Sequence, residues 1–249
     1  MKKISAFSAS IAAALAISAC GGGGGDSGSA STASAAQGLW IGTTTTNRTV
    51  TGLVFSDGTY YVLYSPVGNP TAIAGVVQGS GTAGTSTFSS SNARDFNLEG
   101  LGVLSATVSA NYAAKQAFNG TVNYTSGGVT SFATTYNSAY ETAPTLANVA
   151  GTYTGQVALS IGVQSATVIV SSNGTISGGG NGCALSGTAT PRTDGNAYTL
   201  SITFGASPCF FANQTFTGVA YYNSATKRLY GAAPNAARTD GVLFVGTKP

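Results

Sequence analysis

The sequence contains no histidine, and only 7% of its 249 residues are charged. An average soluble domain has about 25% charged residues, so Ser, Thr, Asn and Gln must supply most of the polar surface here. The absence of histidine excludes the Ser-His nucleophile pair and removes the commonest general base and metal ligand. Hydrophobic residues nevertheless make up 43% of the chain, which is enough for a sizeable core and excludes disorder throughout.

The chain begins with an apolar stretch that is too short to span a membrane. Met1, Lys2 and Lys3 form a positively charged start, and a mostly apolar run with interspersed serines follows from Ile4 to Ala19. A membrane-spanning helix needs about 20 apolar residues, whereas this order of charged and apolar segments is typical of an export signal. We expect residues 1–19 to be a signal peptide.

The segment Ile17-Ser18-Ala19-Cys20 resembles the lipobox of bacterial lipoproteins. The resemblance implies a diacylglycerol on the sulfur of Cys20 and an acyl chain, such as palmitate, on the new amino terminus; two or more acyl chains anchor a protein stably. The alternative is an ordinary cleaved signal peptide. Because Gly21 replaces the Asp that retains such proteins at the inner membrane, the resemblance favours a lipid anchor in the outer membrane, on its periplasmic or cell-surface face. Residues 20–37, rich in Gly, Ser and Ala, predict a lipidated flexible linker.

From residue 38 onward, short β-type runs alternate with turn sequences. The predicted strands include Thr59–Tyr64, Val129–Tyr136 and the short run Thr175–Ile176. Asp57-Gly58 and Asn173-Gly174 lie between such runs and predict hairpins, because these pairs supply the positive φ angles of tight turns. Hydrophobic and polar residues alternate most clearly from Tyr198 to Phe204, and the only helix we expect is one turn within Thr142–Val149. The fold class is therefore all-β, an antiparallel barrel or sandwich, because closure or stacking protects the strand edges.

Two sequence matches suggest that the chain repeats itself. Gly38–Gly42 matches Gly151–Gly155, and Gly120–Tyr124 matches Gly218–Tyr222. If these matches are not chance similarity between Gly/Thr/Tyr-rich strands, residues 38–143 and 144–249 form two similar β-rich halves in tandem. The pattern leaves open whether they form one barrel or two.

Gly38-Leu39-Trp40 resembles the start of lipocalin- and avidin-like barrels, in which the aromatic residue plugs one end; the second half has Tyr153 in this place. The lipobox, the Gly-rich linker and the two β-rich halves together resemble a proteobacterial envelope lipoprotein family without an assigned activity. This resemblance implies an envelope location and carries no catalytic residues to this chain.

Cys183 and Cys209 remain once Cys20 is assigned to lipid. An even pair in an oxidising compartment predicts a disulfide, and closing a loop of about 27 residues contributes roughly 3 to 4 kcal/mol. Metal binding or a nucleophilic cysteine is the alternative, but neither has a histidine partner.

Three short motifs match known functional patterns, but we assign no cofactor, metal or catalytic site to any of them. Gly79–Gly84 has dinucleotide-loop spacing without a following helix, and Ser224–Lys227 has the spacing of penicillin-binding enzymes without their companion motifs. Asp95–Gly100 begins like a calcium loop, but we favour a strand with Phe96 and Leu98 inward and the polar residues outward. We expect no enzyme activity, cofactor or metal. After loss of the signal peptide the chain has eight basic and seven acidic residues. This near-neutral balance argues against nucleic acid as a partner.

The aromatic residues suggest a binding function. A ligand- or glycan-stacking platform is predicted from four of them, with core packing as the alternative: Trp40, Tyr60, Tyr61 and Tyr64. We hypothesise an outer-membrane lipoprotein that binds a protein or glycan partner, and keep two alternatives open. One is a barrel that carries a small apolar ligand, which an unfilled interior would favour. The other is a hydrolase that uses two carboxylates from the following set: Asp57, Asp95, Glu99, Glu141 and Asp194.

Overall fold

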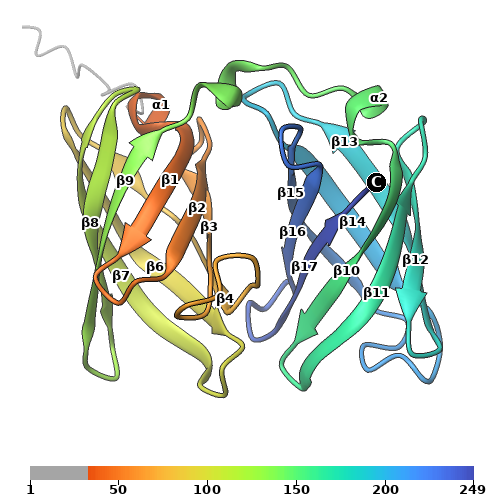
Figure 1. Cartoon of the computed structure of the whole chain (residues 1–249). Coiled ribbons are helices and arrows are strands. Elements are labelled where there is room, and N and C mark those ends of the chain that lie inside the picture. Colours follow the sequence, from red (N-terminus) through yellow and green to blue (C-terminus); the bar gives the residue numbers. More distant parts are fainter. Residues whose placement is uncertain (1–32) are drawn as a thin grey trace, which may run out of the picture. The chain divides into compact units, whose positions relative to one another are not determined.

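The structure is a computed structural model that describes residues 33–249, which form two closed antiparallel β-barrels in tandem (Figure 1). The predicted signal peptide, the lipid acceptor Cys20 and most of the predicted linker lie outside the described residues. The all-β prediction is confirmed, and the question of one barrel or two is answered as two.

The first barrel is built from the strands before residue 137. They are β1 (Gly38–Thr44), β2 (Thr49–Val54), β3 (Thr59–Tyr64), β4 (Gly75–Ser80), β5 (Thr82–Ala83), β6 (Thr87–Asn97), β7 (Gly102–Ala113), β8 (Ala117–Tyr124) and β9 (Val129–Tyr136). Pairing of β1 with β9 and of β4 with β6 closes the ring, and the two-residue β5 adds only to the end of β6.

The second barrel has eight strands, each paired with the next along the chain. They are β10 (Gly151–Leu159), β11 (Gly162–Val170), β12 (Thr175–Gly180), β13 (Cys183–Pro191), β14 (Tyr198–Phe204), β15 (Thr215–Asn223), β16 (Arg228–Pro234) and β17 (Gly241–Thr247). Pairing of β10 with β17 closes this ring. Closure leaves neither barrel with an open edge for another strand to pair with.

Short helical turns precede the first strand of each barrel. They are α1 (Ala33–Ala36) before β1, and the 3₁₀ turn η1 (Ser138–Glu141) and α2 (Leu146–Val149) before β10. The single turn expected within Thr142–Val149 is confirmed as α2. Across residues 33–249, no helix has the length and apolar character needed to cross a membrane.

The starts of the two barrels are locally equivalent. Trp40 Nε1 donates a hydrogen bond to the carbonyl of Ala36, and the Tyr153 hydroxyl donates one to the carbonyl of Val149 (3.1 and 2.7 Å). Each aromatic side chain is buried and bonds to the end of the helical turn four residues before it. The sequence match between the two starts therefore reflects equivalent positions in the two barrels.

The second sequence match does not reflect equivalent positions. Gly120–Tyr124 lies in β8, the next-to-last strand of the first barrel, whereas Gly218–Tyr222 lies in β15, which is followed by two more strands. This correction shows that similar Gly/Thr/Tyr-rich strands can match by composition alone.

The two barrels contact each other through apolar outer faces. One hydrophobic cluster combines side chains from the first barrel, such as Leu53 and Phe96, with side chains from the second, such as Val219 and Leu243. The guanidinium of Arg238 adds hydrogen bonds to the carbonyls of Gln78 (2.7 Å) and Asn92 (2.8 Å). On these strands the outward residues are therefore buried, which is unusual for a small barrel.

Candidate ligand cavity in the first barrel

The interiors of the two barrels differ in how fully side chains fill them. The first barrel encloses a cavity of about 460 Å³, whereas the second barrel contains two separate smaller spaces of about 70 and 140 Å³. Sites for small ligands in proteins are typically about 300–1,000 Å³. Only the first barrel interior therefore has room for a ligand.

The second barrel is filled at one end by a long connection. Residues 205–214 join β14 to β15 and place Phe211 against Phe204 and Phe216, with ring centroids 5.8 and 4.7 Å away. The predicted disulfide is present and ties Cys209 of this connection to Cys183 at the start of β13. The phenylalanine thus closes the barrel end from the inside.

The equivalent connection in the first barrel is short and does not fill the interior. It joins β6 to β7, the fifth and sixth strands of the ring, through residues 98–101 alone. Two residues at this end, Val67 and Leu101, line the cavity yet are 60% and 67% exposed. The cavity mouth therefore lies at this end of the barrel, opposite the plug formed by Trp40.

Most of the cavity wall is apolar. Aromatic rings lie around Phe118, which is 5.5 Å from Trp40 and 5.3 Å from Phe88 between ring centroids. Further wall residues are aliphatic: Val54, Val62, Val77, Val108 and Val122. An apolar group that enters this space would lose water and gain contacts with these side chains.

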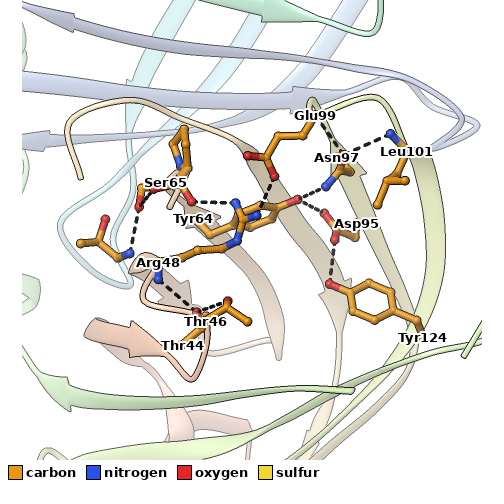
Figure 2. Close-up of polar contacts among 12 residues, drawn as sticks. Thr44, Thr46, Arg48, Tyr64, Ser65, Asp95, Asn97, Glu99, Leu101 and Tyr124 are labelled. Carbon is orange, nitrogen blue, oxygen red and sulfur yellow. Dashed lines mark hydrogen bonds and ion pairs between the residues drawn. The ribbon is translucent and has the colours of Figure 1, made fainter. Parts of the chain in front are cut away.

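A polar cluster lies toward the mouth of the cavity (Figure 2). Asp95 is only 2% exposed, and its carboxylate accepts hydrogen bonds from the hydroxyls of Tyr64 and Tyr124, both at 2.8 Å. Asn97 Nδ2 donates to the Tyr64 hydroxyl at 3.1 Å. The three strands β3, β6 and β8 thus place their last inward side chains around one carboxylate.

Arg48 forms the second part of this cluster. It forms an ion pair with Glu99 at 2.8 Å and donates to the carbonyl of Ser65 at 3.0 Å. Its guanidinium also lies 5.6 Å from the centre of the Tyr64 ring. These contacts hold the arginine across the mouth, with its charge already paired.

Burial governs the protonation of the cluster. Removal from water raises the pKa of the Asp95 carboxyl, while hydrogen bonds from Tyr64 and Tyr124 act in the opposite direction. Burial and the nearby Asp95 charge also raise the pKa of both tyrosines, so their hydroxyls stay protonated and act as donors. A cation brought next to Asp95 would favour its ionised form.

The inward direction of Asp95 corrects the sequence analysis, which placed Phe96 inward and the polar residues outward. The pairing of β6 with β7 shifts register between Ser90 and Ala93, and this β-bulge reverses the inward and outward positions beyond it. Asp95 therefore faces the cavity, and Phe96 packs in the cluster between the barrels. The strand itself is confirmed as far as Asn97 and does not include Leu98 and Glu99.

The side chains of the alternative calcium loop do not converge on one point. Asp95 is bonded to two phenols and Glu99 to Arg48, while Asn97 Oδ1 accepts from the backbone amides of Glu99 and Leu101 at 2.9 and 3.2 Å. In the part of the chain from residue 33 to 249, no group of three His, Cys, Asp or Glu residues has the geometry to hold a metal ion.

The structure places three of the four platform residues along the interior of the first barrel. Trp40, Tyr60 and Tyr64 line the cavity. Tyr61 points away from it and packs between the barrels, 6.5 Å from the Phe55 ring. A ligand that contacts the first three rings has to enter the barrel.

Sequence reasoning missed Arg48 and Tyr124 as site residues. Tyr124 could have been found from the alternation of Phe118, Val122 and Tyr124 along one face of β8. Arg48 lies in the turn before β2, where nothing local in the sequence distinguishes it from an ordinary surface residue.

The carboxylates considered for hydrolysis are held by separate partners. Glu141 pairs with Lys115 (2.6 Å), Asp194 with Arg192 (2.8 Å) and Glu99 with Arg48, while Asp57 accepts from the amide of Thr59 (2.8 Å). Asp95 and Glu99 share the mouth of the first barrel but bond to different groups. No observation in residues 33–249 favours an acid-base pair over these structural contacts.

No family model and no curated protein sequence matches this chain. Among solved structures, the isotype 1 transferrin binding protein B of serogroup B Neisseria meningitidis is similar at 11% identity, over 82% of this chain and 66% of that chain, with a TM-score of 0.28. Two mutants of transferrin binding protein B from Haemophilus parasuis Hp5 give 9% and 10% identity, over 82% and 81% of this chain and 66% and 65% of theirs, with TM-scores of 0.27 and 0.26. The chain thus spans slightly less than two thirds of these proteins, and such low scores carry no inference about its function.

Proposed function

We propose that the protein is an outer-membrane-anchored binding lipoprotein whose first barrel holds a small, largely apolar ligand. The observation that carries the proposal is the cavity of about 460 Å³ in one barrel, compared with spaces of only about 70 and 140 Å³ in the other. An unfilled apolar interior costs packing energy, and a bound ligand would recover that energy. The second barrel then acts as a packed support.

The lipobox ending at Cys20 supports the anchor in this proposal, and the envelope is the corresponding location. Two or more acyl chains would hold the barrels at the membrane surface, where apolar and amphiphilic compounds concentrate. Metabolic labelling with radioactive palmitate tests the anchor: the wild-type chain should be labelled and Cys20→Ser should not. The double variant Cys183→Ser/Cys209→Ser is the matched control and should keep its label.

Trp40 provides a direct assay for the cavity, because it is the only tryptophan in the chain and lines the cavity wall. The apolar dye N-phenyl-1-naphthylamine, titrated into purified protein in detergent-free buffer, should quench Trp40 emission in a saturable way. Val62→Phe should weaken this binding by about tenfold or more, because a ring would occupy ligand space. Val163→Phe is the matched control on the second barrel, where Val163 is 52% exposed, and should bind as the wild type does.

Equal dye affinity in Val62→Phe and wild type would show that the dye binds elsewhere. Either that result or a failure of the wild type to saturate would refute a ligand-binding first barrel.

A further inference from the structure

The first barrel contains one buried carboxylate without a cationic partner. Asp95 lines the cavity and is 2% exposed, and the two hydrogen bonds that its carboxylate accepts come from neutral phenols. None of the ion pairs formed by residues 33–249 includes Asp95. A buried carboxylate is normally paired with a cation or a metal ion, because removing an isolated charge from water is costly.

Burial raises the pKa of Asp95 and the charge of the nearby Arg48 acts to lower it, but Arg48 forms no ion pair with Asp95. Arg48 is paired with Glu99 and also donates to the carbonyl of Ser65. Counting Arg48, Glu99 and an ionised Asp95 together, the mouth carries one net negative charge. The electrostatic complement to this end of the cavity is therefore a positive charge.

The rest of the cavity fits an apolar body attached to that charge. Beyond Asp95 most of the wall consists of aliphatic and aromatic side chains down to Trp40 and Phe118. The hydroxyls of Tyr64 and Tyr124 flank the carboxylate and orient it by hydrogen bonds (Figure 2). The polar end faces the mouth, so a head group would remain near water while the apolar part fills the interior.

We propose that the ligand of the first barrel is a cationic amphiphile, an amine with an apolar body, whose ammonium group binds to Asp95 beside Tyr64 and Tyr124. This inference rests on the proposed function and adds the chemical class of the ligand. In the bound state the ammonium donates to the carboxylate oxygens, which retain their two hydrogen bonds from the phenols.

Three probes with one alkyl chain and different head groups test the proposal: decylamine, decanol and decanoate. Each is used to displace N-phenyl-1-naphthylamine from the purified protein, with Trp40 emission as the readout. Decylamine should bind roughly tenfold to a hundredfold more tightly than decanol, the effect of a hydrogen-bonded charge pair. Decanoate should bind most weakly, because its carboxylate would lie against Asp95 with Arg48 already occupied.

Asp95→Asn should remove the preference for decylamine over decanol, because asparagine keeps the shape without the charge. Asp240→Asn is the matched control: its carboxylate is also hydrogen bonded, to the Ser160 hydroxyl at 2.7 Å, but lies in the second barrel. Its decylamine preference should equal that of the wild type. The charged and titratable groups facing Asp95 are Arg48, Glu99, Tyr64 and Tyr124.

The outcomes separate the two proposals. If decanol binds as tightly as decylamine, or if decanoate binds most tightly, the assignment of a cationic ligand is overturned and the ligand-binding barrel stands. If the dye itself does not bind in the cavity, the proposed function fails first. The wild-type probe series decides these cases even if Asp95→Asn does not fold.

Discussion

Replacing one interior valine by phenylalanine is expected to have opposite effects in the two barrels. Val108 on β7 lines the cavity of the first barrel, and Val168 on β11 lines the small interior space of the second. Both side chains are buried, at 6% and 8% exposure, and both lie on strands that are paired on either side. The pair therefore tests the difference in filling while keeping the chemical change the same.

The magnitudes follow from the space available. In the first barrel the four added carbons can be buried on folding without displacing a neighbour. Their burial contributes up to about 3 kcal/mol to the free energy of unfolding, at roughly 0.8 kcal/mol per methylene. Loss of side-chain freedom and local strain reduce this, so Val108→Phe should change the free energy of unfolding by about 0 to +2 kcal/mol. In the second barrel the same atoms overpack the interior, so Val168→Phe should destabilise by about 1–3 kcal/mol.

Unfolding followed by two signals measures these effects. Trp40 emission reports on the first barrel alone, because it is the only tryptophan, and far-UV circular dichroism reports on both barrels. For a chain of this size, 1 kcal/mol corresponds to roughly 2–4 °C in the melting midpoint. If Val108→Phe lowers the midpoint of the Trp40 transition as much as Val168→Phe lowers that of the second barrel, the first barrel is filled in solution and the reasoning is wrong.

Two further perturbations have expected results. The double variant Cys183→Ser/Cys209→Ser should lose roughly 3 to 4 kcal/mol of stability, from the loop-closure entropy of a 26-residue separation. Circular dichroism should detect this loss, and a variant as stable as the oxidised wild type would contradict it. Asp95→Asn should change how stability depends on pH. Because burial raises the folded-state pKa of Asp95, its contribution to stability is fully present below the ordinary aspartate pKa and is lost as pH rises through the raised value. The stability of the variant relative to the wild type should therefore increase from mildly acidic to neutral pH. A constant difference in denaturation midpoints across that range would contradict the inference that Asp95 is a buried carboxylate without a compensating charge.

Much of the fold could be predicted because many strands carry their own hydrophobic alternation. The predicted runs Thr59–Tyr64 and Val129–Tyr136 coincide with β3 and β9. The run predicted at Thr175–Ile176 extends to Gly180, because three glycines hide the alternation of β12. Strands β4 and β13, rich in small or polar residues, were not predicted, since pairing with their neighbours determines them more than their own pattern does.

The site was less predictable because its determinants are not local. The bulge after Ser90 reverses the inward face of β6, and no Gly or Pro marks it in the sequence. The outward face of β6 is also partly covered, since Phe96 packs against the second barrel. Whether a barrel is filled depends on a residue such as Phe211, which enters from a connection rather than from a strand.

The contrast between the ends of β6 and β14 argues that the first barrel is kept open for a ligand. The last two inward residues of β14 are Ile202 and Phe204, which help to fill the second barrel, whereas those of β6 are Asp95 and Asn97. Burying a carboxylate at such a position costs stability that an apolar residue would not. Folding alone therefore favours the arrangement of the second barrel. The polar pair at the mouth of a cavity is better explained by a bound group that completes its charge and hydrogen bonding.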